Sequence, residues 1–74
     1  MMTIVLNGEK QQVNNNTTVS QLLTSLNLEN KRLAVEINQQ IIPRSEFDNH
    51  ILVDSDRVEI VQAIGGGSQV SDFQ

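Results

Sequence analysis

Three consecutive glycines, Gly65–Gly67, are the residues of this sequence best suited to chemistry. Glycine has no Cβ, so such a segment can pass through a channel too narrow for any side chain. A terminal glycine carboxylate is unhindered at its α-carbon, so another enzyme can adenylate it and a nucleophile can then reach the acyl carbon. The stretch from Ala63 to Gly67 extends about 16–18 Å, which is enough to carry a chain end into a partner's active site. On composition alone, a flexible linker is the alternative interpretation.

Other groups capable of chemistry are few. His50 is the only histidine and there is no cysteine, which excludes a thiolate metal site, a thiol nucleophile and a His-pair zinc site. Asp54 and Asp56 could bind a cation, but Ca²⁺ takes about six or more oxygens, and an Asp-x-Asp sequence is more often a turn. We therefore expect no bound metal or cofactor, and we expect the chain not to be an enzyme.

The charge balance is acidic, with nine Asp and Glu against five Lys and Arg and a net charge of −4. This is the wrong sign for binding phosphate backbones, so we expect no nucleic-acid partner. The excess of acids lies in residues 38–74, either as a solvated surface or as a docking face for a basic partner. No segment approaches the roughly 18 apolar residues of a membrane span, and the N-terminus does not fit a signal peptide. We expect a cytoplasmic protein with no membrane partner.

The first half of the sequence predicts a hairpin followed by a helix. Asn7-Gly8 accepts the two positive φ angles of a type I′ turn, so it should join a strand at 3–6 to a strand at 9–13. Thr18 followed by Gln21 fits a capping box. The residues after it have the spacing of one apolar helical face: Val19, Leu22, Leu23 and Leu26.

The second half predicts short strands. Residues 33–37 and 58–62 alternate as strands with one buried face, and 40–42 form a short strand that stops at Pro43. Ser45–Phe47 fits one helical turn, and 51–53 is a short apolar segment before a turn at 54–56. The strands that flank the helix can run parallel through a right-handed crossover.

This order of elements predicts an α+β fold, with a mixed sheet packed on one main helix. It resembles the β-grasp, or ubiquitin-like, fold. From Ala63 onward the pattern stops, so we expect a domain at 1–64, followed by a flexible glycine arm and a mobile C-terminal extension at 65–74.

Two segments resemble a specific family within that fold. The block Ala34–Arg44, an apolar strand, an Asn turn and an Ile-Pro-Arg ending, resembles the signature of ThiS, the sulfur carrier family of thiamine biosynthesis. The segment Asp54–Gly67 resembles that family's acidic turn, last strand and diglycine. Together the resemblance covers about residues 2–67.

The resemblance implies a carrier whose terminal glycine carboxylate is activated. An E1-like adenylyltransferase (ThiF in this family) would use ATP and Mg²⁺ to form the acyl-adenylate. A sulfur donor enzyme would convert it to a thiocarboxylate, and thiazole synthase (ThiG type) would take the sulfur. By position, Gly67 is the reactive residue and Gly66 precedes it. Gly65 stands where the family varies, and Ala63 and Ile64 form the root of the arm.

Two departures from the family pattern stand out. Ser55 replaces the middle Gly of the acidic turn, a minor change if the turn avoids positive φ. Residues 68–74 follow Gly67, and an amide at Gly67 has no free carboxylate to adenylate. We expect the chain to be a precursor that a peptidase cuts after Gly67; a non-functional variant or an added remnant are the alternatives.

For docking, the sequence predicts acidic residues near the arm, Glu59, Asp54 and Asp56, facing basic residues of the activating enzyme. Val61 and Ile64 are the expected apolar anchors, because buried apolar contacts outweigh rim charges at most interfaces. Two other functions stay open: a sulfur carrier for molybdopterin or a specialised metabolite, and a ubiquitin-like interaction module whose glycines only tether a tail.

Overall fold

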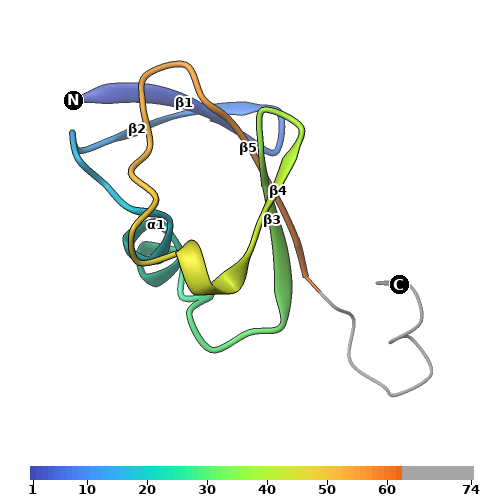
Figure 1. The fold of residues 1–74 in the computed structure, drawn as a ribbon. Helices are drawn as coiled ribbons and strands as arrows, with labels where there is room; N and C mark the ends of the chain where they lie inside the picture. The colour runs from blue at the N-terminus through green and yellow to red at the C-terminus, as the bar shows by residue number, and fades with distance from the viewer. Residues whose placement is uncertain (63–74) are drawn as a thin grey trace.

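Two hairpins and a final strand between them build one mixed sheet in the computed structural model, which describes residues 1–62. The strand order is β2-β1-β5-β3-β4, and the single α-helix packs against one face of the sheet (Figure 1). The elements, in chain order, are β1 (Met2–Leu6), β2 (Glu9–Val13), α1 (Val19–Ser25), β3 (Leu33–Ile37), β4 (Gln40–Ile42), the 3₁₀ turn η1 (Arg44–Glu46) and β5 (Arg57–Gln62). This is the α+β architecture that the sequence predicts.

Both hairpins turn on an asparagine with positive φ. In the β1–β2 hairpin Asn7 has φ 49° and Gly8 has φ 86°, which confirms the positive angles that a type I′ turn requires. In the β3–β4 hairpin Asn38 has φ 53° and Gln39 has φ 72°. The second hairpin therefore has the same pair of positive φ angles without a glycine.

Helix α1 begins as the sequence predicts. The Thr18 side chain accepts a hydrogen bond from the Gln21 N–H, at 3.1 Å, and the Gln21 side chain accepts one from the Thr18 N–H, at 3.0 Å. This capping box satisfies two N–H groups that a helix start leaves unpaired. The helix is only two turns long, so it depends on burying Val19, Leu22 and Leu23 against the sheet.

The parallel pair in the sheet is β1 with β5, in register Val5 with Arg57 and Leu6 with Val58. The strands that flank the helix, β2 and β3, run in the same direction, as expected, but they are not neighbours because β1 and β5 lie between them. The last strand therefore lies at the centre of the sheet, paired with β3 from Val58 to Gln62.

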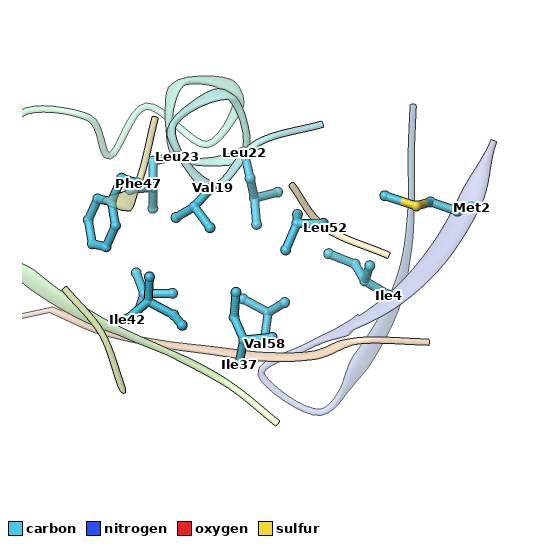
Figure 2. Close-up of a cluster of buried hydrophobic side chains, with 11 residues drawn as sticks. Met2, Ile4, Val19, Leu22, Leu23, Ile37, Ile42, Phe47, Leu52 and Val58 are labelled. Carbon is cyan, nitrogen blue, oxygen red and sulfur yellow. The ribbon is translucent and has the colours of Figure 1, made fainter. Parts of the chain in front are cut away.

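A single hydrophobic core lies between the helix and the sheet. Figure 2 shows Val19, Leu22 and Leu23 facing Ile37, Ile42 and Val58 across this core. Phe47 and Leu52, from the segment between β4 and β5, complete this core, Phe47 near Leu23 and Leu52 near Ile4 (Figure 2); Ile4 and Leu52 are at most 1% exposed. A core this small must be nearly complete to offset the entropy of ordering the chain.

The short apolar segment 51–53 makes an isolated bridge between Ile51 and Thr18. Ser55 has φ 74°, so the acidic turn does not avoid positive φ and the substitution of Gly there is not neutral. The domain boundary at 64 and the expected arm and tail lie outside the described residues. Between residues 1 and 62 no helix is long and apolar enough to cross a membrane.

Candidate functional site at the end of the last strand

Strand β5 leads directly to the residues that the sequence marks for chemistry. It ends at Gln62, five residues before Gly67. The arm residues themselves, Ala63, Ile64 and Gly65–Gly67, lie outside the described part of the chain. What the structure adds is the body that carries them: β5 is held by β3 on one side and by β1 on the other. Pairing on both sides fixes the position of β5, and with it the point from which residues 63–67 continue.

The sheet face opposite the helix carries exposed apolar side chains close to the end of β5. Side chains of a strand alternate between the two faces of the sheet. Val58 is buried on the helix side, so Glu59 and Val61 lie on the other face. Val61 is 55% exposed and pairs with Ala34, and Ile41 on β4 is 70% exposed. Five residues of this face form what we name the outer patch: Ala34, Glu36, Ile41, Glu59 and Val61.

Two like charges stand directly opposite each other on this face. Glu59 pairs with Glu36 across β5 and β3, and Glu36 in turn pairs with Ile41 across β3 and β4. Like charges at directly opposed positions destabilise a sheet, so this arrangement is a cost to the isolated domain. A cationic group of a partner would relieve it. Sequence reasoning found Glu59 and Val61 but missed Glu36, whose position beside Glu59 depends on strand register.

Of the two turn aspartates, Asp54 is exposed and Asp56 is not. Asp54 Oδ1 accepts a hydrogen bond from the Thr3 N–H at 2.9 Å, and the rest of its carboxylate is near the surface. Asp56 is 5% exposed, and its carboxylate accepts from Asn38 Nδ2 and from the Val53 N–H, both at 2.9 Å. The expectation that Asp56 is a docking charge is therefore corrected: burial and internal hydrogen bonds withdraw its side chain from the surface.

Both turn asparagines bond to β5, which sequence reasoning did not anticipate. Asn38 Oδ1 accepts from the Arg57 N–H at 3.0 Å, at the start of the strand. Asn7 Oδ1 accepts from the Ile60 N–H at 2.8 Å, near its end. The sequence did indicate that both residues lie in turns. Their amide side chains, which can bond to a neighbouring strand, were the only sign of this contact in the sequence. Which backbone group each one reaches depends on the pairing of β5 with β1 for Asn7 and with β3 for Asn38.

His50 shows no catalytic arrangement. It is half-buried in the loop before β5, and its carbonyl accepts the Val19 N–H at 3.0 Å at the start of the helix. Its backbone therefore helps to hold the start of α1.

Comparison with protein-family models gives a match to the ThiS family over residues 3–67. The matched region thus ends at Gly67 and includes the whole described sheet and helix. Residues 68–74 fall outside it.

The similar proteins include sulfur carriers and thiazole synthases. The chain is 38% identical over 66 residues to the sulfur carrier protein ThiS of Escherichia coli, covering 100% of that protein, and 41% identical over 63 residues to ThiS of Bacillus subtilis, covering 96% of it. It is also 39% identical over 71 residues to a thiazole synthase of Paramagnetospirillum magneticum, but spans only 22% of that protein's length. Among solved structures, the crystal structure of the thiamine biosynthesis protein ThiS of Geobacter metallireducens matches with a TM-score of 0.76 and 30% identity, covering 89% of this chain and 100% of that one.

Proposed function

This chain belongs to the ThiS family of sulfur carrier proteins, and from that membership we propose that the carboxylate of Gly67, once it is free, carries the sulfur for thiamine biosynthesis. The protein is a small carrier and not a catalyst. The observation that carries the proposal is where the family match ends. It stops at Gly67, five residues after the central strand β5 ends at Gln62.

The proposed chemistry takes place in partner enzymes. An E1-like adenylyltransferase of the ThiF type uses ATP and Mg²⁺ to join AMP to the Gly67 carboxylate, and pyrophosphate leaves. A sulfur donor enzyme supplies the sulfur that replaces the AMP, so the carboxylate becomes a thiocarboxylate. The carrier itself contributes an unhindered acyl carbon and no acid, base or metal ligand. We propose that it binds no cofactor of its own.

A thiazole synthase of the ThiG type is the proposed recipient of the sulfur. The segment similar to this chain in the thiazole synthases of Paramagnetospirillum magneticum and Magnetococcus marinus occupies 22% and 20% of those proteins. A carrier-like segment in the same polypeptide as a thiazole synthase is what a functional association between the two would produce. This supports the pairing, and the remaining partners follow from the family resemblance.

Residues 68–74 require removal before this chemistry begins. In the full chain the carbonyl of Gly67 is part of a peptide bond to Ser68, so no carboxylate is available there. We propose that a processing peptidase cuts this bond, which leaves Gly67 as the new terminus with Gly66 and Gly65 before it.

The outer patch is the proposed docking surface for the activating enzyme. Val61 is its apolar anchor, together with Ala63 and Ile64 at the root of the arm. Glu59, beside Glu36, attracts cationic side chains, and exposed Asp54 adds to the acidic field. Exposed ion pairs contribute only about 0–1 kcal/mol each, so the charges act mainly on the rate of association.

Pyrophosphate release tests the activation step directly. A chain ending at Gly67 and the full chain are each mixed with the E1-like enzyme, ATP and Mg²⁺. The proposal predicts release with the shortened chain and none with the full chain. A Gly67→Val form of the shortened chain is the matched control, since it keeps the carboxylate and adds only a side chain that a narrow channel excludes.

The two other candidate functions give different results. A carrier for molybdopterin or a specialised metabolite would release pyrophosphate with a different activating enzyme, and a strain lacking this chain would grow without added thiazole. An interaction module would bind its partner through the sheet with no dependence on ATP. Growth that is restored by thiazole supports the thiamine carrier.

A further inference from the structure

The side chain of Asn7 continues the pairing of β1 with β5 after β1 has turned away. Strand β1 ends at Leu6, and the Asn7 main-chain N–H still donates to the Val58 carbonyl at 2.8 Å. One step further along β5, Asn7 Oδ1 accepts from the Ile60 N–H at 2.8 Å and Nδ2 donates to the Ile60 carbonyl at 3.4 Å. The carboxamide thus makes the two bonds that a peptide group of a longer β1 would make.

The direction of the backbone groups shows why Ile60 depends on this side chain. Alternate residues of a strand direct their N–H and C=O groups to opposite neighbours. The Arg57 carbonyl accepts from the Asn38 N–H on the β3 side, and the Val58 carbonyl faces β1. Ile60 therefore also faces β1, where Asn7 is its partner among the described residues. Without this contact the last bond on that side is at Val58, and the strand from there to Gln62 is held by β3 alone.

We propose that Asn7 is a positioning residue for the glycine arm, an inference that rests on the proposed function. Asn7 touches no reacting atom. By holding the β1 edge of β5 at Ile60, while β3 holds the other edge, it sets the place and direction from which the chain continues past Gln62. Docking through the outer patch does not need this contact, but delivery of Gly67 to a partner's active site does. Loss of the contact therefore lowers kcat for activation and leaves KM for the carrier unchanged.

Asn7→Gly removes the carboxamide and little else. Glycine adopts the positive φ of this position, 49°, without strain, so the turn is kept. Asn38→Gly is the matched control. Asn38 has φ 53°, and its carboxamide also makes two hydrogen bonds to the β5 region, to the Arg57 N–H and to Asp56. Those bonds lie at the start of β5, far along the strand from the arm.

The experiment compares these variants in the chain ending at Gly67, with the E1-like enzyme and ATP, at a temperature where both are folded. Loss of one hydrogen bond of ordinary net strength corresponds to about a fivefold to tenfold change in an equilibrium. We expect Asn7→Gly to lower kcat for pyrophosphate release about tenfold, with KM within about twofold of the wild type, by the same estimate. Asn38→Gly should lower the melting temperature and leave kcat unchanged.

Amide hydrogen exchange in the full chain supplies a second measurement that needs no enzyme. Exchange at Ile60 should be about tenfold faster in Asn7→Gly, because the N–H has lost its acceptor. Unchanged exchange there, a wild-type kcat for Asn7→Gly, or an equal loss of kcat in Asn38→Gly would each overturn the inference. A wild-type chain that releases no pyrophosphate overturns the proposed function and the role of Asn7 with it, whereas wild-type release with unimpaired Asn7→Gly overturns the role of Asn7 alone.

Discussion

The two ends of β5 differ in what surrounds them. At the start, Asp56 is 5% exposed and is bonded to Asn38 and to the Val53 backbone. At the end, Val61 is 55% exposed, and Asn7 makes the last contact from the β1 side within the described residues. A strand of six residues thus runs from a buried polar network to an exposed apolar surface. We therefore expect substitutions at the start of β5 to act mainly on stability, and substitutions at its end to act mainly on the proposed docking.

The largest effect is expected from the buried end. Asp56→Ala leaves Asn38 Nδ2 and the Val53 N–H without their acceptor, and buried donors without partners are costly. We expect the free energy of unfolding to fall by about 3 kcal/mol. Urea denaturation measures this loss.

Asp54→Ala is the control for this change. It removes two exposed hydrogen bonds, from the Thr3 N–H and from the Ser55 hydroxyl, and water can replace both, so we expect a loss of about 1 kcal/mol or less. Equal losses for the two variants would contradict the contrast between the buried and the exposed aspartate.

At the exposed end, Val61→Arg should change stability little, because Val61 is 55% exposed and does not belong to the core. The substitution places a cation on the outer patch and removes its apolar anchor. We therefore expect KM for the carrier to rise about tenfold, which corresponds to about 1.4 kcal/mol of binding free energy. Val53→Arg is the control: Val53 is 58% exposed but lies before β5 starts. A similar rise in KM for both would argue against docking through the outer patch.

The second residue of each hairpin turn, Gly8 in one and Gln39 in the other, can be substituted in opposite directions. Gln39→Gly relieves a side chain at φ 72°, and we expect a gain of about 1 kcal/mol in the free energy of unfolding. Gly8→Ala introduces a side chain at φ 86° and should lose about as much. A Cβ at Gly8 would meet no atom within 4 Å, so the loss is conformational and not a clash. Thermal unfolding of both variants tests the sign.

A small gain in stability is expected at the glutamate pair. Glu59→Lys converts the opposition with Glu36 into an attraction, which should stabilise the domain by a few tenths of a kcal/mol, up to about 1. The same change should slow association with the activating enzyme and reverse its dependence on salt. Stopped-flow association at two ionic strengths separates the two effects. Faster association would mean that the partner surface is not cationic.

The sequence predicted the features of this molecule that depend on local spacing. Asn7-Gly8 indicated its hairpin, Thr18 and Gln21 indicated the capping box, and the triglycine with the block at 34–44 indicated the family. It missed features that depend on long-range register. The burial of Asp56 and the Glu36–Glu59 opposition arise only once β5 lies between β1 and β3. The bonds of Asn7 to Ile60 join residues that are 53 positions apart in the sequence.

The central claim is that the Gly67 carboxylate is the group that accepts sulfur. The direct measurement is the mass of the C-terminal peptide of a chain ending at Gly67, after exposure to the activating enzyme, ATP and sulfide. We predict that the peptide ending at Gly67 gains the mass difference between sulfur and oxygen, and that omitting ATP prevents this gain. An unchanged mass with active enzyme present, or a sulfur located on another peptide, would contradict it.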